Sequence, residues 1–181
     1  MLEECRLPYT EIDPAEIPSE DYLSISPTGA VPATTDTEND ISLFESAAIL
    51  LYLAERASRF LPADLARRSE VLQWLLFDAA TIGPSLLNIY QLSYLGDAVR
   101  PAIEASRKDL RAAMSLLNHR LEQRTWVACS CSIADFSLFP FMEMAEDFAD
   151  LPLSRYPGID AWLDRMRQRP GVRRGILKHD S

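Results

Sequence analysis

Long apolar runs are missing from this chain of 181 residues. The longest, Ala47–Leu51 and Trp74–Phe77, are far shorter than the roughly 20 residues that a membrane-spanning helix needs. The first residues, Met1 to Glu4, are acidic, whereas a secretory signal peptide begins with basic residues. The sequence therefore predicts no membrane association and a cytoplasmic protein.

Cysteine and histidine are also scarce. The chain has three cysteines, Cys5, Cys129 and Cys131, an odd number without the spacing of a metal site. Its two histidines stand far apart in the sequence. We therefore expect reduced thiols in place of a disulfide framework, and no bound metal.

Positive charge is nearly absent from the first quarter of the chain. Residues 1–46 contain eleven Asp or Glu and a single Arg, a net charge of −10, whereas residues 47–181 are close to neutral at +1. Nucleic-acid binding depends on neutralising phosphates, so this distribution argues against a nucleic-acid partner. The negative charge also does not attract an anionic ligand to the first part of the chain. The simpler interpretation of these acidic residues is a solvated surface.

The first part of the chain contains strand patterns. Tyr9–Asp13 alternates and predicts a short strand, and Ala33–Asp36 and Ile41–Phe44 predict a hairpin around Thr37–Asp40. From Ser46 the apolar period becomes helical and continues to Phe60. This part of the sequence therefore predicts a domain that mixes strands and helix.

After a linker at Leu61–Asp64, nothing has the pattern of a strand. Apolar spacing predicts a helix interrupted or kinked at Gly83–Pro84, and another that begins at Pro101. Ser132 and Asp135 form a capping-box pattern at the start of a third helix. A last helix is expected from Tyr156–Gly158 to a stop at Arg169–Gly171. The fold class is therefore α+β, with predicted domains at residues 1–61 and 66–181.

Two short motifs in the first domain suggest a binding site. Val31-Pro32 contains the one kind of peptide bond for which the cis form costs only roughly 0.5–1 kcal/mol. Glu45-Ser46 opens a helix, where a hydroxyl, a backbone N–H and the positive helix end can receive a carboxylate. Taken alone, the first motif is also typical of a turn and the second of an ordinary helix start.

Longer segments around these motifs resemble the glutathione S-transferase superfamily. Ser26–Ala33 is similar to the family's loop into a strand, and Ser46–Glu55 is similar to the helix of its second glutathione-binding motif. Ser132–Phe136 resembles the family's folding motif and Trp162–Met166 its closing helix, while Glu70–Leu75 is most similar to the Nu-class or Ure2p-like branch. The resemblance implies a thioredoxin-like N-terminal domain followed by an all-α C-terminal domain.

The resemblance also implies ligands, partners and site residues. Glutathione is the expected co-substrate, without a metal, and Val31, Pro32, Glu45 and Ser46 are the residues expected to bind it. Trp74, Tyr90 and Tyr94 come from the region where the family builds its hydrophobic-substrate pocket, although aromatic residues at helical spacing are also typical of a core. A homodimer that acts on a small electrophile or disulfide is expected.

The resemblance begins late in the family's N-terminal domain. Leu2–Tyr9 resembles the end of the family's first helix and the start of its second strand, so the thioredoxin-like domain is expected to be truncated. The family's thiol-activating Ser, Tyr, Cys or Thr has no counterpart here, and no catalytic residue is assigned. With that segment supplied, the expected activity is conjugation of glutathione to an electrophile or reduction of a small disulfide. The alternative is a non-catalytic binding or interaction module.

Overall fold

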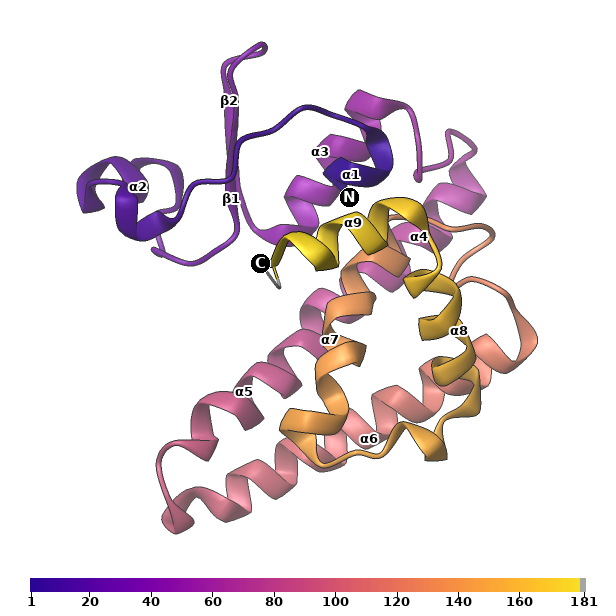
Figure 1. Cartoon of the computed structure of the whole chain (residues 1–181). Helices are drawn as coiled ribbons and strands as arrows, with labels where there is room; N and C mark the ends of the chain where they lie inside the picture. The colour runs from indigo at the N-terminus through magenta and orange to yellow at the C-terminus, as the bar shows by residue number, and fades with distance from the viewer. Residues whose placement is uncertain (180–181) are drawn as a thin grey trace.

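The computed structural model describes residues 1–179, and it shows a small sheet-containing part followed by a helical part (Figure 1). The elements of the first part are α1 (Leu2–Cys5), the short 3-10 turn η1 (Pro14–Glu16), α2 (Ser19–Ile25), β1 (Ala33–Asp36), β2 (Ile41–Phe44) and α3 (Ser46–Ala57). The α+β class predicted from the sequence is confirmed.

The hairpin has the bounds that the sequence predicts. β1 pairs with β2 in antiparallel register, with Ala33 opposite Phe44 and Asp36 opposite Ile41. Asp36 is buried and accepts hydrogen bonds from Tyr52 and Arg56, both on α3. The Tyr52 hydroxyl is the main reason why the pKa of Asp36 lies well below its usual range. This carboxylate therefore fastens the turn end of the hairpin to α3.

The strand predicted at Tyr9–Asp13 is wrong. Residues 7–13 follow an irregular path, and the only sheet among residues 1–179 is the two-stranded hairpin. A strand persists when a neighbour satisfies its backbone groups, and no described segment pairs with this one. The Tyr9 hydroxyl instead donates to Glu3 Oε1 at 3.1 Å.

The second part of the chain is helical throughout. Its elements are α4 (Leu65–Phe77), the π-helical turn η2 (Asp78–Ile82), α5 (Gly83–Ser93), η3 (Asp97–Val99), α6 (Arg100–Gln123), α7 (Ile133–Ala149), η4 (Leu153–Arg155), α8 (Pro157–Arg167) and α9 (Pro170–His179). The sequence predicts an interruption at Gly83–Pro84, and the structure shows a π-helical turn directly before it. Pro84 lies just after this π-helical turn, and a proline and a π-helical turn are both places where the hydrogen-bond ladder of a helix is interrupted.

The end of the chain differs from the prediction. The helix predicted from Tyr156–Gly158 to a stop at Arg169–Gly171 is present as α8, but it is not the last, because Pro170 begins a further helix, α9. A proline both ends one helix and suits the first position of the next, so the sequence signal is ambiguous. α9 lies against α1 (Figure 1). At this contact the Gly171 amide donates to Glu4 Oε1 at 3.0 Å. Arg169 pairs with Glu4 Oε2 at 2.6 Å.

The hydrophobic core lies in the helical part. The largest fully buried side chains all follow Thr81 in the sequence, and they include Ile82, Leu110 and Trp162. The loop between α3 and α4 joins the two parts, and Phe60 O in this loop accepts a hydrogen bond from Ile133 N at 3.0 Å. The division into domains at residues 1–61 and 66–181 stays a prediction. Within residues 1–179, every helix is too short or too polar to traverse a lipid bilayer.

Candidate functional site

The hairpin brings the two predicted binding motifs to the same end of the sheet. Pro32 directly precedes Ala33, Glu45 directly follows Phe44, and Ala33 lies opposite Phe44. Two motifs that are separate in the sequence are thereby held side by side. We call this site the corner, and it consists of Val31, Pro32, Glu45 and Ser46.

Val31 presents its backbone at the surface. The Val31–Pro32 bond is cis. The Val31 residue is 68% exposed, and neither its amide nor its carbonyl has a hydrogen-bond partner among the described residues. An exposed, unpaired N–H and C=O on one residue can pair with an extended peptide-like ligand, as one strand pairs with another.

The loop before Val31 is tied to α2. The Ala30 carbonyl accepts hydrogen bonds from the Tyr22 hydroxyl and from the Ser26 hydroxyl, each at 2.9 Å. Gly29 has a φ of 69°, a conformation that glycine adopts without strain, and its amide donates to Ser26 O at 2.8 Å. The loop is therefore ordered by α2 before any ligand arrives.

Glu45 and Ser46 form the second half of the corner. Glu45 has φ 69° and ψ 114°, a backbone conformation that is costly for a residue other than glycine, about 1–3 kcal/mol. It directly precedes α3, and no side chain caps the first turn of this helix. Ser46 is exposed at the helix start. The free first-turn amides, the helix dipole and the Ser46 hydroxyl together suit a carboxylate.

The aromatic residues expected in a hydrophobic pocket lie in two places. Trp74 is buried, with its ring 5.4 Å from that of Phe77 and the Arg120 guanidinium 5.6 Å above it. Tyr90 and Tyr94, with ring centroids 5.2 Å apart, lie near the C-terminal end of α5. The assignment of these residues to a substrate pocket stays a prediction.

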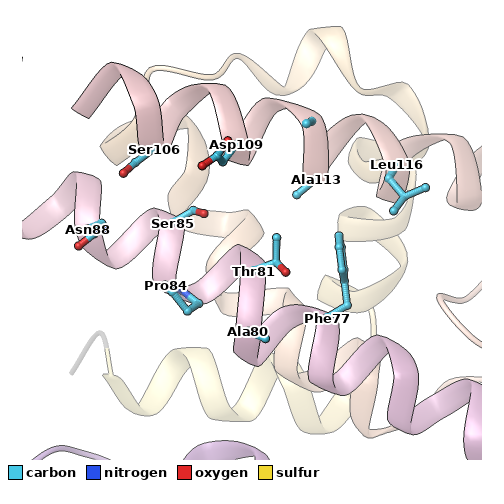
Figure 2. A pocket seen from close by; sticks show the side chains of 11 residues that line it. Phe77, Ala80, Thr81, Pro84, Ser85, Asn88, Ser106, Asp109, Ala113 and Leu116 are labelled. Atoms are coloured by element: carbon cyan, nitrogen blue, oxygen red, sulfur yellow. The ribbon is translucent and has the colours of Figure 1, made fainter. Parts of the chain in front are cut away.

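Sequence reasoning missed a groove between α5 and α6, which Figure 2 shows from close by. It has a volume of ≈ 530 Å³. It is lined by Phe77, Ala80, Thr81, Pro84, Ser85, Asn88, Ser106, Asp109, Ala112, Ala113 and Leu116. The signal in the sequence was the small polar series Thr81, Ser85 and Asn88, which repeats at helical spacing on one face.

Two of the three cysteine thiols, those of Cys5 and Cys131, are unsuited to nucleophilic chemistry. All three cysteines are free. Burial raises the pKa of the Cys5 thiol, and burial together with the nearby Asp135 raises that of Cys131 to about 12. The thiolate is the reactive form, so both of these side chains stay protonated and inert at neutral pH. Among residues 1–179, no group of three or more His, Cys, Asp or Glu could hold a metal ion.

Two family models match the chain. Residues 1–56 match the glutathione S-transferase N-terminal domain, and residues 82–170 match the glutathione S-transferase C-terminal domain. The first match contains the whole corner, and the second begins at the last residue of the π-helical turn.

Known proteins and structures show the same relationship. The chain is 34% identical to the disulfide-bond oxidoreductase YfcG of Escherichia coli K12, over 87% of the chain and 76% of that protein. Two further bacterial relatives are longer, and the chain spans 64% and 59% of their lengths. A glutathione transferase from Pseudomonas putida, solved with one glutathione disulfide bound per subunit, is 28% identical with a TM-score of 0.85, covering 96% of this chain and 82% of that one.

Ure2p, solved in complex with S-hexylglutathione, shares the fold at a TM-score of 0.87 and 22% identity, covering 96% of this chain and 88% of its own.

Proposed function

This chain belongs to the glutathione S-transferase family, and from that premise we propose that its corner binds glutathione. The observation that carries the proposal is the meeting of two complementary features at one end of the hairpin. The unpaired backbone of Val31 suits the cysteinyl part of glutathione. The uncapped start of α3, with Ser46, suits the γ-glutamyl carboxylate.

The reaction that the site supports best is reduction of a small disulfide by glutathione. A glutathione thiolate attacks one sulfur of the substrate disulfide, the S–S bond breaks, and a mixed disulfide and a free thiol form. A second glutathione then attacks the mixed disulfide, which yields glutathione disulfide and the second thiol. Two glutathione molecules supply the two electrons, so no protein cysteine is needed, in keeping with the raised pKa of Cys5 and Cys131. Relatives named disulfide-bond oxidoreductases support this choice.

Conjugation of glutathione to an electrophile is the second candidate reaction, and it uses the same bound thiolate. Either reaction requires a group that lowers the pKa of the glutathione thiol, and the corner residues alone do not supply one. Without such a group the chain binds glutathione but does not accelerate its reactions, because only interactions that strengthen in the transition state do so. A non-catalytic binding module is therefore the alternative function.

A titration of the full chain with glutathione, followed by NMR of its backbone amides, tests the proposal. We expect the amides of Val31, Ser46 and Ala47 to shift together. Activity is then measured with a small disulfide and with a generic aromatic electrophile. Binding with turnover of the disulfide supports the reductase, and binding without turnover of either substrate supports the binding module. A spectrum that stays unchanged at millimolar glutathione would refute the proposed site.

We further propose that the chain acts as a homodimer in the cytoplasm, with a small molecule and not a nucleic acid as its partner. The support for a reducing compartment is that all three cysteines are unpaired. The support against nucleic acid is the net charge of −10 over residues 1–46. Sedimentation of the purified chain tests the oligomeric state.

A further inference from the structure

Two hydroxyl groups of α2 meet on one carbonyl oxygen at the entrance to the corner. Ala30 O accepts from Tyr22 Oη and from Ser26 Oγ, each at 2.9 Å. Both distances are typical of well-formed hydrogen bonds. Tyr22 lies in α2 and Ser26 is the C-cap residue of that helix, whose amide bonds to Tyr22 O, so the two donors are held together at the helix end. The two lone pairs of this carbonyl are therefore both satisfied by side chains of the protein.

The carbonyl of Ala30 and the amide of Val31 belong to the same peptide group. This group is planar, and it is trans, because the only cis bond among the described residues is Val31–Pro32. Fixing the direction of the carbonyl therefore fixes the direction of the Val31 N–H, which points the opposite way. Hydrogen bonds to a carbonyl also polarise the peptide group, so that its N–H becomes a stronger donor.

The two hydroxyls are themselves held in place. Ser26 is fully buried, and its amide donates to Tyr22 O at 2.8 Å. Its carbonyl accepts from Gly29 N at 2.8 Å, which closes the turn that leads to Ala30. Tyr22 is half-buried, so its ring is partly fixed by packing. The arrangement leaves the peptide group before Val31 with little freedom to rotate.

We propose that Tyr22 and Ser26 are positioning residues that orient the Val31 N–H toward the cysteinyl carbonyl of glutathione. Neither side chain touches the ligand, since each acts through the Ala30 carbonyl. Without them the peptide group can rotate, and part of the binding free energy is spent on ordering it. This inference rests on the proposed function of the corner and names two residues outside it on which that function depends.

The test uses the full chain labelled with ¹⁵N and five variants: Tyr22→Phe, Ser26→Ala, the double variant, Ser26→Thr and Ser24→Ala. Ser24 is the matched control, because its hydroxyl also donates to a backbone carbonyl in α2, that of Asp21 at 2.7 Å, but not to the loop. Two quantities are measured: the mobility of the Val31 amide in the free protein by ¹⁵N relaxation, and the Kd for glutathione by titration.

We expect each single variant to raise the Kd about five-fold, which corresponds to one hydrogen bond of ordinary strength. The double variant should raise it by at least 25-fold, because one remaining hydroxyl still restrains the carbonyl in each single variant. The Val31 amide should become more mobile in the same order, while Ser24→Ala leaves both quantities unchanged. Ser26→Thr keeps a hydroxyl and should restore most of the affinity.

The outcomes separate this inference from the proposed function. If glutathione does not shift the Val31 and Ser46 amides of the unmodified chain, the proposed function fails. If the unmodified chain binds but Tyr22→Phe and the double variant bind equally well, the positioning role is refuted. Tyr22→Phe removes one partly exposed hydroxyl and retains the ring, so it keeps the test decisive even if Ser26→Ala does not fold.

Discussion

Trp162 of α8 donates its indole N–H to Oδ1 of Asp135 at 2.9 Å, so the carboxylate that caps α7 also holds a second helix. The same carboxylate accepts from Ser132 N at 2.9 Å and from Val127 N at 3.1 Å. The pKa of Asp135 is raised above its usual value, because the effect of burial is larger than that of the hydrogen bonds, which lower it. Asp135 is thus a structural centre of the helical part.

Replacing Asp135 should therefore cost more than the loss of a helix cap. We expect Asp135→Ala to lower the free energy of unfolding by about 2–4 kcal/mol, because it removes the acceptor of four buried donors, the Val127 and Ser132 amides, the Ser132 hydroxyl and the Trp162 indole, whereas a cap alone is worth about 1 kcal/mol. Denaturant titration measures this difference. Ser132→Ala is the control, with an expected loss of about 1 kcal/mol. Equal losses in the two variants would contradict the wider role of Asp135.

Asp78 should make stability depend on pH. It is buried in the π-helical turn, where its Oδ2 accepts from Ser137 Oγ at 2.5 Å and its Oδ1 has no partner among the described residues. Burial raises the pKa of this carboxyl from 3.8 to about 6. The folded protein therefore keeps this proton when the unfolded chain has lost it, so the free energy of unfolding falls as pH rises from about 4 to about 6.

The matching variant is Asp78→Asn, which cannot ionise. We expect it to be more stable than the unmodified chain by about 2–3 kcal/mol at pH 7 and equally stable at pH 4. Unfolding curves at both pH values measure the effect. A difference that is the same at pH 4 and pH 7 would show that Asp78 does not titrate in this window.

Gly171 should be intolerant of a side chain. A Cβ at this position would lie 2.6 Å from Glu4 N, closer than two such atoms approach. We expect Gly171→Ala to lower the free energy of unfolding by about 1–3 kcal/mol and to free α1, so that trypsin cleaves after Arg6 more rapidly. Gly175→Ala in the same helix is the control, because nothing lies within 4 Å of its Cβ. Gly175→Ala should leave the free energy of unfolding unchanged or raise it. A similar loss of stability in both variants would show that the cost comes from the helix itself and not from the contact with Glu4.

Ser46 should contribute directly to glutathione binding. We expect Ser46→Ala to raise the Kd about ten-fold, because a hydrogen bond to a charged group is worth about 1.5 kcal/mol. Calorimetry measures the change. Ser42→Ala is the control: Ser42 is a nearby exposed serine whose hydroxyl bonds that of Thr35 at 3.0 Å on the hairpin. An unchanged Kd in Ser46→Ala would show that the γ-glutamyl carboxylate of glutathione binds elsewhere.

The sequence predicted the elements that local chemistry specifies. The hairpin bounds, the helix entry at Pro101 and the capping pair Ser132 and Asp135 are all confirmed, because turn residues, alternation and caps act over a few positions. The corner residues were named from the resemblance of the surrounding segments to a family and not from local chemistry, and their role in binding stays a prediction. The sequence did not show that these residues lie together at one end of the hairpin, because that placement depends on the register of Ala33 with Phe44.

The features that the sequence did not predict depend on contacts with residues outside the element concerned. Tyr9–Asp13 has the alternation of a strand, but a strand also needs a neighbour. The bonds from Val127 and Trp162 to Asp135 cross between segments, as does the pairing of Tyr22 and Ser26 with Ala30 at the end of α2. No local pattern in the sequence marks these residues as partners of one another.

The contact between Glu4 and Arg169 joins positions that are 165 residues apart. On the ribosome, Glu4 is made long before Arg169, so it has no partner until 165 further residues have been added. Contacts of such long sequence separation form late, because a large loop must close before they contribute. The helical part can assemble first, and the docking of α1 onto α9 then follows as a late step.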